Sequence, residues 1–153
     1  MYKKYALFSF LILLGFVCQF SWAAQRSSKD DAVAMVKKAG AYYQEHGLKK
    51  ALSAFNNPKG PFIKNELYLF VYDKDGVNLA HGQNQKMIGK NLLEMRDADG
   101  VFLIKKVIEI GDSKTGHGWQ RYKWPNPITK QVEEKLSYTE KFGELYISCG
   151  IYP

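Results

Sequence analysis

Regular alternation of side chains in the last part of the chain most constrains its fold. Segments 67–72 and 145–152 carry apolar residues at every second position, and segment 133–142 does so at Leu136 and Tyr138. Because alternate side chains of a strand face opposite sides of a sheet, these segments share one apolar face that must be covered. This face comprises Leu67, Leu69, Val71, Leu136, Tyr138, Leu145, Ile147, Cys149 and Ile151.

Helical patterns elsewhere can supply the cover. Residues 27–46 repeat apolar side chains at steps of three and four, open on Ser and Asp, and stop at Gly47. A short helical piece follows at 48–55, and residues 101–111 suit a further helix that ends at Gly111. Two strands, 67–72 and 77–82, join through the tight turn 73–76, and three more follow at 117–124, 133–142 and 145–152. This order predicts an α+β fold, a five-stranded antiparallel sheet with the long N-terminal helix packed behind it.

The opposite face of the sheet has the composition of a pocket for a small polar ligand. It carries aromatic rings with hydroxyls, one ammonium group and two serine hydroxyls. These belong to Tyr68, Phe70, Tyr72, Lys135, Ser137, Tyr146 and Ser148. Segment 117–124 leaves two alternatives, since either Trp119, Arg121 and Lys123 or Gln120, Tyr122 and Trp124 face the pocket.

The N-terminus has the layout of a secretory signal peptide. Two lysines precede the uncharged, almost wholly apolar stretch 6–17, and small residues stand at 21 and 23. That stretch is short for a membrane-spanning helix, which needs about 20 residues. We expect residues 1–23 to be removed, with cleavage after Ala23 or Ala24, leaving 24–153 as one periplasmic domain; the alternative is an uncleaved anchor. Cys18 would leave with the signal peptide, so Cys149 forms no internal disulfide and is expected to be buried.

Several function classes find no support in the sequence. The net charge is +7, but the lysines are scattered, so nucleic-acid binding is not expected. The three histidines lack metal-site spacing, and the two D-x-D-G segments, 73–76 and 97–100, lack the Glu of a calcium loop, so we interpret them as turns. Nucleophile-elbow, phosphate-loop and dinucleotide motifs are missing. We therefore expect a protein that is not an enzyme and uses no metal or cofactor.

A series of short motifs resembles a known family. In order they are D-x-x-G with L-A-H, G-K-N-L, D-A-D-G, G-x-G-W-x-x-Y-x-W-x-N-P, K-x-S-Y and a final G-I-Y, over about residues 28–152. Together they are similar to the single Cache domain of bacterial extracytoplasmic sensors. The resemblance implies a PAS-like Cache fold with a pocket in front of the sheet, and ligands such as acetate, propionate, pyruvate or lactate.

The resemblance also implies a signalling role. Family members usually precede a membrane helix and a chemoreceptor or histidine kinase module, which this chain lacks after its domain. We therefore expect a stand-alone exported member that reports to a separate membrane histidine kinase, chemoreceptor or transporter.

The site residues follow from the needs of a carboxylate, which requires a cation or several donors in place of water. Lys135 is the expected charge partner. The other candidates are Tyr68, Tyr122 and Tyr146 as hydroxyl donors, Trp119 and Phe70 as walls, Arg96 as a cap, and His81 at a strand end. For Arg96 the alternative is a solvent-facing salt bridge, and for Trp119 it is core packing.

Two other functions stay open at this stage. One is a protein–protein interaction module with no small ligand. The other is a small periplasmic enzyme with a close His–acid pair, for example one that involves His81. The ligand, the partner and the oligomeric state are left open by the sequence.

Overall fold

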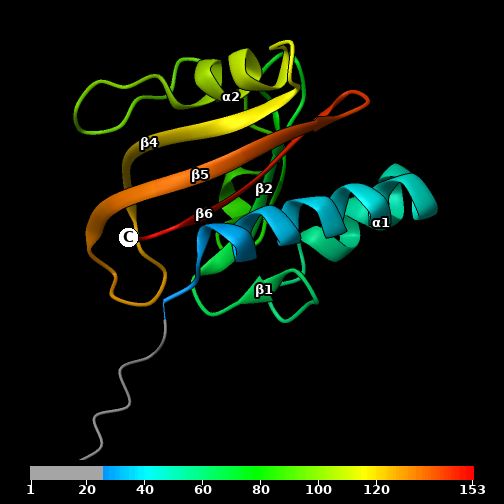
Figure 1. Ribbon diagram of the computed structural model, residues 1–153, viewed down its shortest axis with the longest axis horizontal. Coiled ribbons are helices and arrows are strands. Elements are labelled where there is room, and N and C mark those ends of the chain that lie inside the picture. The colour runs from blue at the N-terminus through cyan, green and yellow to red at the C-terminus, as the bar shows by residue number, and fades with distance from the viewer. Residues whose placement is uncertain (1–25) are drawn as a thin grey trace, which may run out of the picture.

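An antiparallel sheet separates two helices in this computed structural model, which describes residues 26–153 (Figure 1). The elements are α1 (Lys29–Phe55), β1 (Ile63–Lys64), β2 (Leu67–Tyr72), β3 (Asn78–His81), the 3-10 turn η1 (Gln85–Met87), α2 (Leu103–Gly111), β4 (His117–Pro125), β5 (Val132–Phe142) and β6 (Leu145–Ile151). The sheet order is β1-β2-β6-β5-β4, and β3 also pairs with β2. The predicted signal peptide, 1–23, lies outside the described residues.

The α+β architecture predicted from the sequence is confirmed, with differences at two places. The sheet has six strands rather than five, because the two-residue β1 pairs with the start of β2 and is too short to show alternation. Helix α1 comprises two helical pieces that meet at Gly47, whose φ of 75° and ψ of 170° are non-helical, so the break predicted at this glycine is confirmed. Helix α2 begins at Leu103 rather than at 101, because Phe102 is extended. Among residues 26–153, neither helix is long and apolar enough to cross a membrane.

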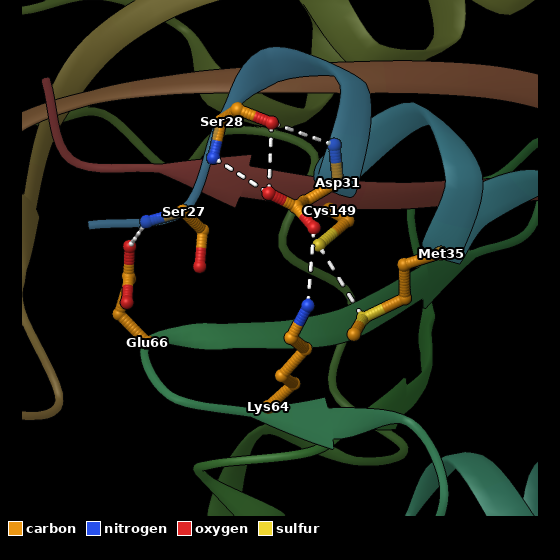
Figure 2. A network of polar contacts seen from close by, with 7 residues as sticks. All are labelled: Ser27, Ser28, Asp31, Met35, Lys64, Glu66 and Cys149. Atoms are coloured by element: carbon orange, nitrogen blue, oxygen red, sulfur yellow. Dashed lines mark hydrogen bonds and ion pairs between the residues drawn. The ribbon is translucent and has the colours of Figure 1, made fainter. Parts of the chain in front are cut away.

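The apolar face predicted from alternation is packed against α1. Every residue of that face is buried in one cluster with Ala32, Met35, Val36, Ala39, Ala51 and Phe55 of the helix. Burial of each large aliphatic side chain contributes about 1.5–3 kcal/mol. Cys149 is buried here as a free thiol, 3.6 Å from the Met35 sulfur (Figure 2). This cluster is the main hydrophobic core, and it leaves the other face of the sheet available for a site.

The start of α1 is fastened to the β1–β2 corner (Figure 2). Ser28 and Asp31 form a capping box, in which the Asp31 amide donates to Ser28 Oγ at 3.1 Å and the Ser28 amide donates to Asp31 Oδ2 at 2.9 Å. These bonds, with the nearby Lys64 ammonium, lower the pKa of Asp31 to about 2. The Ser27 amide donates to the buried Glu66 carboxylate at 2.7 Å. The helix is thereby fixed in direction where it meets the sheet.

The two D-x-D-G segments are turns, as predicted, and both use the same hydrogen bonds. Asp73 accepts from the Val77 amide at 2.9 Å, and Asp97 accepts from the Val101 amide at 2.9 Å. Asp97 also accepts from the Lys123 amide at 2.9 Å. The long connection after β3 is thereby tied to β4, beside the second face of the sheet.

Candidate functional site

A cavity lies between the second face of the sheet and α2. It is small, with free space for about one water molecule. Sheet residues form its floor and walls, and apolar side chains of α2 with Met95 of the long connection form its roof. The lining comprises Tyr68, Phe70, Tyr72, His81, Met95, Leu103, Ile104, Val107, Gln120, Tyr122, Trp124 and Lys135.

Lys135 supplies the one cation of this lining. Its side chain is 1% exposed, and Nζ donates to the Tyr68 hydroxyl at 2.7 Å. Nζ also lies 4.0 Å from the ring centre of Tyr68 and 4.9 Å from that of Phe70. In the described part of the chain no carboxylate forms an ion pair with it. Burial lowers the pKa of Lys135 from 10.5 to about 7, because few groups replace the lost water.

His81 is a neutral hydrogen-bonding group beside this lysine. Its Nδ1 accepts from the Asn84 amide at 3.0 Å, which assigns the proton of the neutral ring to Nε2. Burial, and then the charge of Lys135, lower its pKa to about 3. The ring centre lies 5.1 Å from that of Tyr68. His81 can therefore donate to a ligand without carrying charge.

Strand β4 supplies the far wall and resolves the alternative that the sequence left open. Gln120, Tyr122 and Trp124 line the cavity. The Tyr122 hydroxyl is paired with Ser137 Oγ at 2.9 Å. The amide oxygen of Gln120 is buried and has no hydrogen-bond partner among residues 26–153.

Five of the eight residues proposed from the sequence line the cavity, and three do not. The five are Tyr68, Phe70, His81, Tyr122 and Lys135. Trp119 lies on the other face of β4, packed against the α1 side core, which agrees with its core-packing alternative. Arg96 is exposed and stacks 3.7 Å over the Phe102 ring instead of capping the cavity. Tyr146 is buried, but its hydroxyl donates to Asp112 at 2.8 Å, outside the lining.

The lining also contains seven residues outside the eight site candidates, although the sequence placed one of them, Tyr72, on this face of the sheet. They are Tyr72, Met95, Leu103, Ile104, Val107, Gln120 and Trp124. Gln120 and Trp124 belonged to one of the two alternatives for segment 117–124. The apolar positions of helix 101–111 were the available signal for the roof, but alternation within strands does not say which helix covers the second face.

Gly150 makes room for Lys135. A Cβ at this position would lie 2.5 Å from Lys135 Cε and closer still to Ser137 Oγ. We therefore expect Gly150→Ala to displace the lysine, to weaken ligand binding, and to lower the free energy of unfolding by about 1–3 kcal/mol. Urea unfolding and calorimetric titration measure the two effects. A variant with wild-type stability and affinity would show that the lysine needs no such space.

The arrangement suits retention of a small anion. One ammonium group, the Tyr68 hydroxyl and the His81 donor meet beneath an apolar roof. Within residues 26–153 no group of three or more His, Cys, Asp or Glu side chains could hold a metal ion. Such a pocket offers a charge partner, donors and walls for a short carbon chain.

Two curated relatives match part of the chain. The sensor histidine kinase MctS of Rhizobium johnstonii is 36% identical over 87 residues, which are 56% of this chain and 18% of MctS. The methyl-accepting chemotaxis protein CtpM of Pseudomonas aeruginosa is 36% identical over 73 residues, 47% of this chain and 13% of CtpM. The chain thus spans less than a fifth of the length of either relative.

Solved structures share the fold. A methyl-accepting chemotaxis protein from Vibrio parahaemolyticus superposes with a TM-score of 0.70 at 21% identity, over 81% of this chain and 87% of that one. A Cache chemosensory domain, whose structure is described as the basis for carboxylic acid recognition, superposes with a TM-score of 0.62 at 23% identity, over 80% of this chain and 86% of that one. The periplasmic sensor domain of a chemotaxis protein superposes with a TM-score of 0.63 at 21% identity, over 80% of this chain and 88% of that one.

The family assignment rests on the whole described chain. The family model for single Cache domain 2 matches residues 26–153. This is a family of sensor domains that bind small ligands, not of catalysts, and the homologues are receptors. The chain belongs to the single Cache domain 2 family.

Proposed function

We propose that this protein is a periplasmic sensor that binds a small organic acid in the cavity without transforming it. The ligand carboxylate replaces water at Lys135 Nζ and accepts from the Tyr68 hydroxyl and from His81 Nε2–H. The short carbon chain lies against Phe70 and the roof of α2. Occupancy is then reported to a separate signalling protein.

The buried, unpaired ammonium of Lys135 is the observation that carries the proposal. A buried lysine usually has a carboxylate partner, because an unpaired charge is costly to remove from water. Here it meets one hydroxyl and three aromatic rings, those of Tyr68, Phe70 and Tyr152. A ligand carboxylate would supply the missing charge. One structural neighbour with the same fold is described as recognising carboxylic acids, which supports this choice of ligand.

The location and the partner are part of the same proposal. Removal of residues 1–23 would release the domain into the periplasm, and mass spectrometry of the mature protein tests the cleavage site. The partner would be a membrane histidine kinase, chemoreceptor or transporter, since the relatives are named as a histidine kinase and a chemotaxis protein.

Thermal unfolding of the purified protein against two- to six-carbon organic acids, amino acids and amines tests ligand binding. A ligand that binds only the folded state at 100 times its dissociation constant adds about 2.7 kcal/mol to the free energy of unfolding. We expect a rise in Tm with acids and none with amines. A rise in Tm with amines alone, or no rise with any of these compounds, would exclude the proposal.

A further inference from the structure

The ligand cavity adjoins two grooves that open to solvent. The first, called here the α2 groove, lies along α2 and β4 and contains Lys105, Lys106 and Glu109; it shares one residue, Gln120, with the cavity lining. The second, called here the outer groove, contains about 230 Å³ of free space. Because the cavity itself has free space for about one water molecule, an organic acid reaches Lys135 only if a wall between the cavity and one groove moves.

The outer groove leads to the polar groups of the cavity. It lies between the loop after β3 and the turn after β4, and three of its residues also line the cavity: Tyr68, His81 and Trp124. The Tyr68 hydroxyl is the group that accepts from Lys135 Nζ. The α2 groove contains neither Tyr68 nor His81. A carboxylate that arrives through the outer groove therefore meets its proposed partners first.

The lining of the outer groove suits the passage of an anion. Among residues 26–153 it contains one cation, Lys130, and no carboxylate, whereas the α2 groove contains Glu109. Its neutral donors are the amide side chains of Gln83, Asn84 and Asn126. Lys130 is exposed at the rim, and Lys135 is buried in the cavity. An anion on this route is attracted by two cations in turn and is not repelled by a like charge.

Trp124 is the least constrained member of the wall between the outer groove and the cavity. Tyr68 is 1% exposed, and its hydroxyl is held at 2.7 Å from Lys135 Nζ. His81 is 3% exposed, and its Nδ1 is held by the Asn84 amide at 3.0 Å. Trp124 is only half-buried and lies next to the last residue of β4. Rotation of this indole therefore opens the wall with the least loss of contacts.

We infer that small organic acids enter the cavity through the outer groove, and that Trp124 is the gate between the groove and the cavity. The inference rests on the proposed binding of a carboxylate at Lys135. Lys130 draws the anion to the groove, and rotation of the Trp124 indole then gives it access to the ammonium. A barrier on the only route changes the rates of entry and exit together and leaves the affinity nearly unchanged.

A bulky label in each groove tests the route. Gln83→Cys places a thiol in the outer groove, and Arg121→Cys is the matched control in the α2 groove; both positions are exposed, while the native Cys149 is buried. Each variant, with and without a bulky non-fluorescent maleimide, is mixed with acetate, propanoate, pyruvate or lactate, and tryptophan fluorescence is followed by stopped flow. We expect the label at 83 to slow association and dissociation tenfold or more, with the dissociation constant changed less than threefold. The label at 121 should change neither rate more than twofold.

Two further variants test the gate and the rim. Trp124→Ala should raise the dissociation rate constant at least tenfold without lowering the association rate constant. Lys130→Met should lower the association rate constant and its dependence on ionic strength, and leave the dissociation rate constant unchanged. Thermal unfolding without ligand checks that each variant is folded, and the label at 83 decides the route even if Trp124→Ala does not fold.

The outcomes separate the route from the binding site. Rates that are insensitive to the label at 83, or that are slowed by the label at 121 instead, would overturn the inference and leave carboxylate binding in place. A folded Trp124→Ala variant with wild-type rates would remove Trp124 as the gate. Calorimetric titration that shows no binding of any of the four acids to the wild type would overturn both the inference and the proposed function.

Discussion

Lys135→Met is expected to weaken binding of every organic acid that stabilises the wild-type protein by at least 100-fold. The substitution leaves the ligand carboxylate buried without a cation, and breaking a buried charge pair costs about 3–5 kcal/mol. Calorimetric titration measures the loss. Because the unliganded ammonium is buried beside one hydroxyl and aromatic rings, its removal should leave the Tm of the free protein at or above the wild-type value at pH 6.

A matched variant tests whether the effect is specific to the cavity. Lys50→Met makes the same chemical change at an exposed position of α1 that is not part of the cavity lining. It should change neither affinity nor stability appreciably. If Lys135→Met folds and still binds acids with wild-type affinity, the ammonium is not the carboxylate site and the proposed function fails at its central residue.

The two faces of the sheet were predictable because alternate side chains of a strand face opposite sides. Burial made the α1-facing residues of β2 and β6, and Leu136 and Tyr138 of β5, apolar, so both the α1-covered core and the polar second face followed from sequence. Lys135 stood out for the same reason, as a cation in the middle of a face that had to be covered, whereas Lys141 shares its alternation nearer the end of β5.

Strand β4 could not be oriented by the same reasoning. Both of its alternating sets contain tryptophan and polar groups, so neither set is distinctly apolar. Its placement depends on pairing with β5, where Tyr122 lies opposite Lys135 and Trp119 lies opposite Tyr138. The two alternatives for Trp119, pocket wall and core packing, follow from this ambiguity.

The positions of Arg96 and Tyr146 depend on tertiary contacts that leave no periodic signal. Arg96 lies on the connection before α2, where its guanidinium stacks on Phe102. Tyr146 has the predicted strand face, but the Asp112 carboxylate after α2 takes its hydroxyl. A strand pattern gives the direction of a side chain, while its partner is decided by elements that are distant in sequence.

Proton uptake on ligand binding is the expected consequence of the low pKa of Lys135, about 7 in the unliganded protein. Above pH 7 the free lysine is mostly neutral, whereas a bound carboxylate favours the ammonium. The dissociation constant should therefore be nearly constant at pH 5.5–6.5 and rise by up to tenfold per pH unit above pH 7. Titration in buffers of different ionisation enthalpy should show almost no proton uptake at pH 6 and nearly one proton at pH 8.5.

The other titratable groups around Lys135 stay neutral over this range, so the proton can be assigned. Burial raises the pKa of Tyr68, Tyr122, Tyr152 and Cys149, and it lowers that of His81 to about 3.

As the pH rises above 7, the free energy of unfolding of the unliganded protein should increase while its affinity for acids decreases. The folded pKa lies below the unfolded value of 10.5, so between pH 7 and 10.5 the unfolded chain holds a proton that the folded chain lacks. Lys135 therefore raises the free energy of unfolding with pH across this window, by at most about 1.4 kcal/mol per unit. Urea unfolding of the wild type and of Lys135→Met isolates this contribution, since the variant lacks the group. A dissociation constant that is flat from pH 6 to 9, with no proton uptake, would mean that Lys135 is charged before the ligand arrives, and that some other group already balances it.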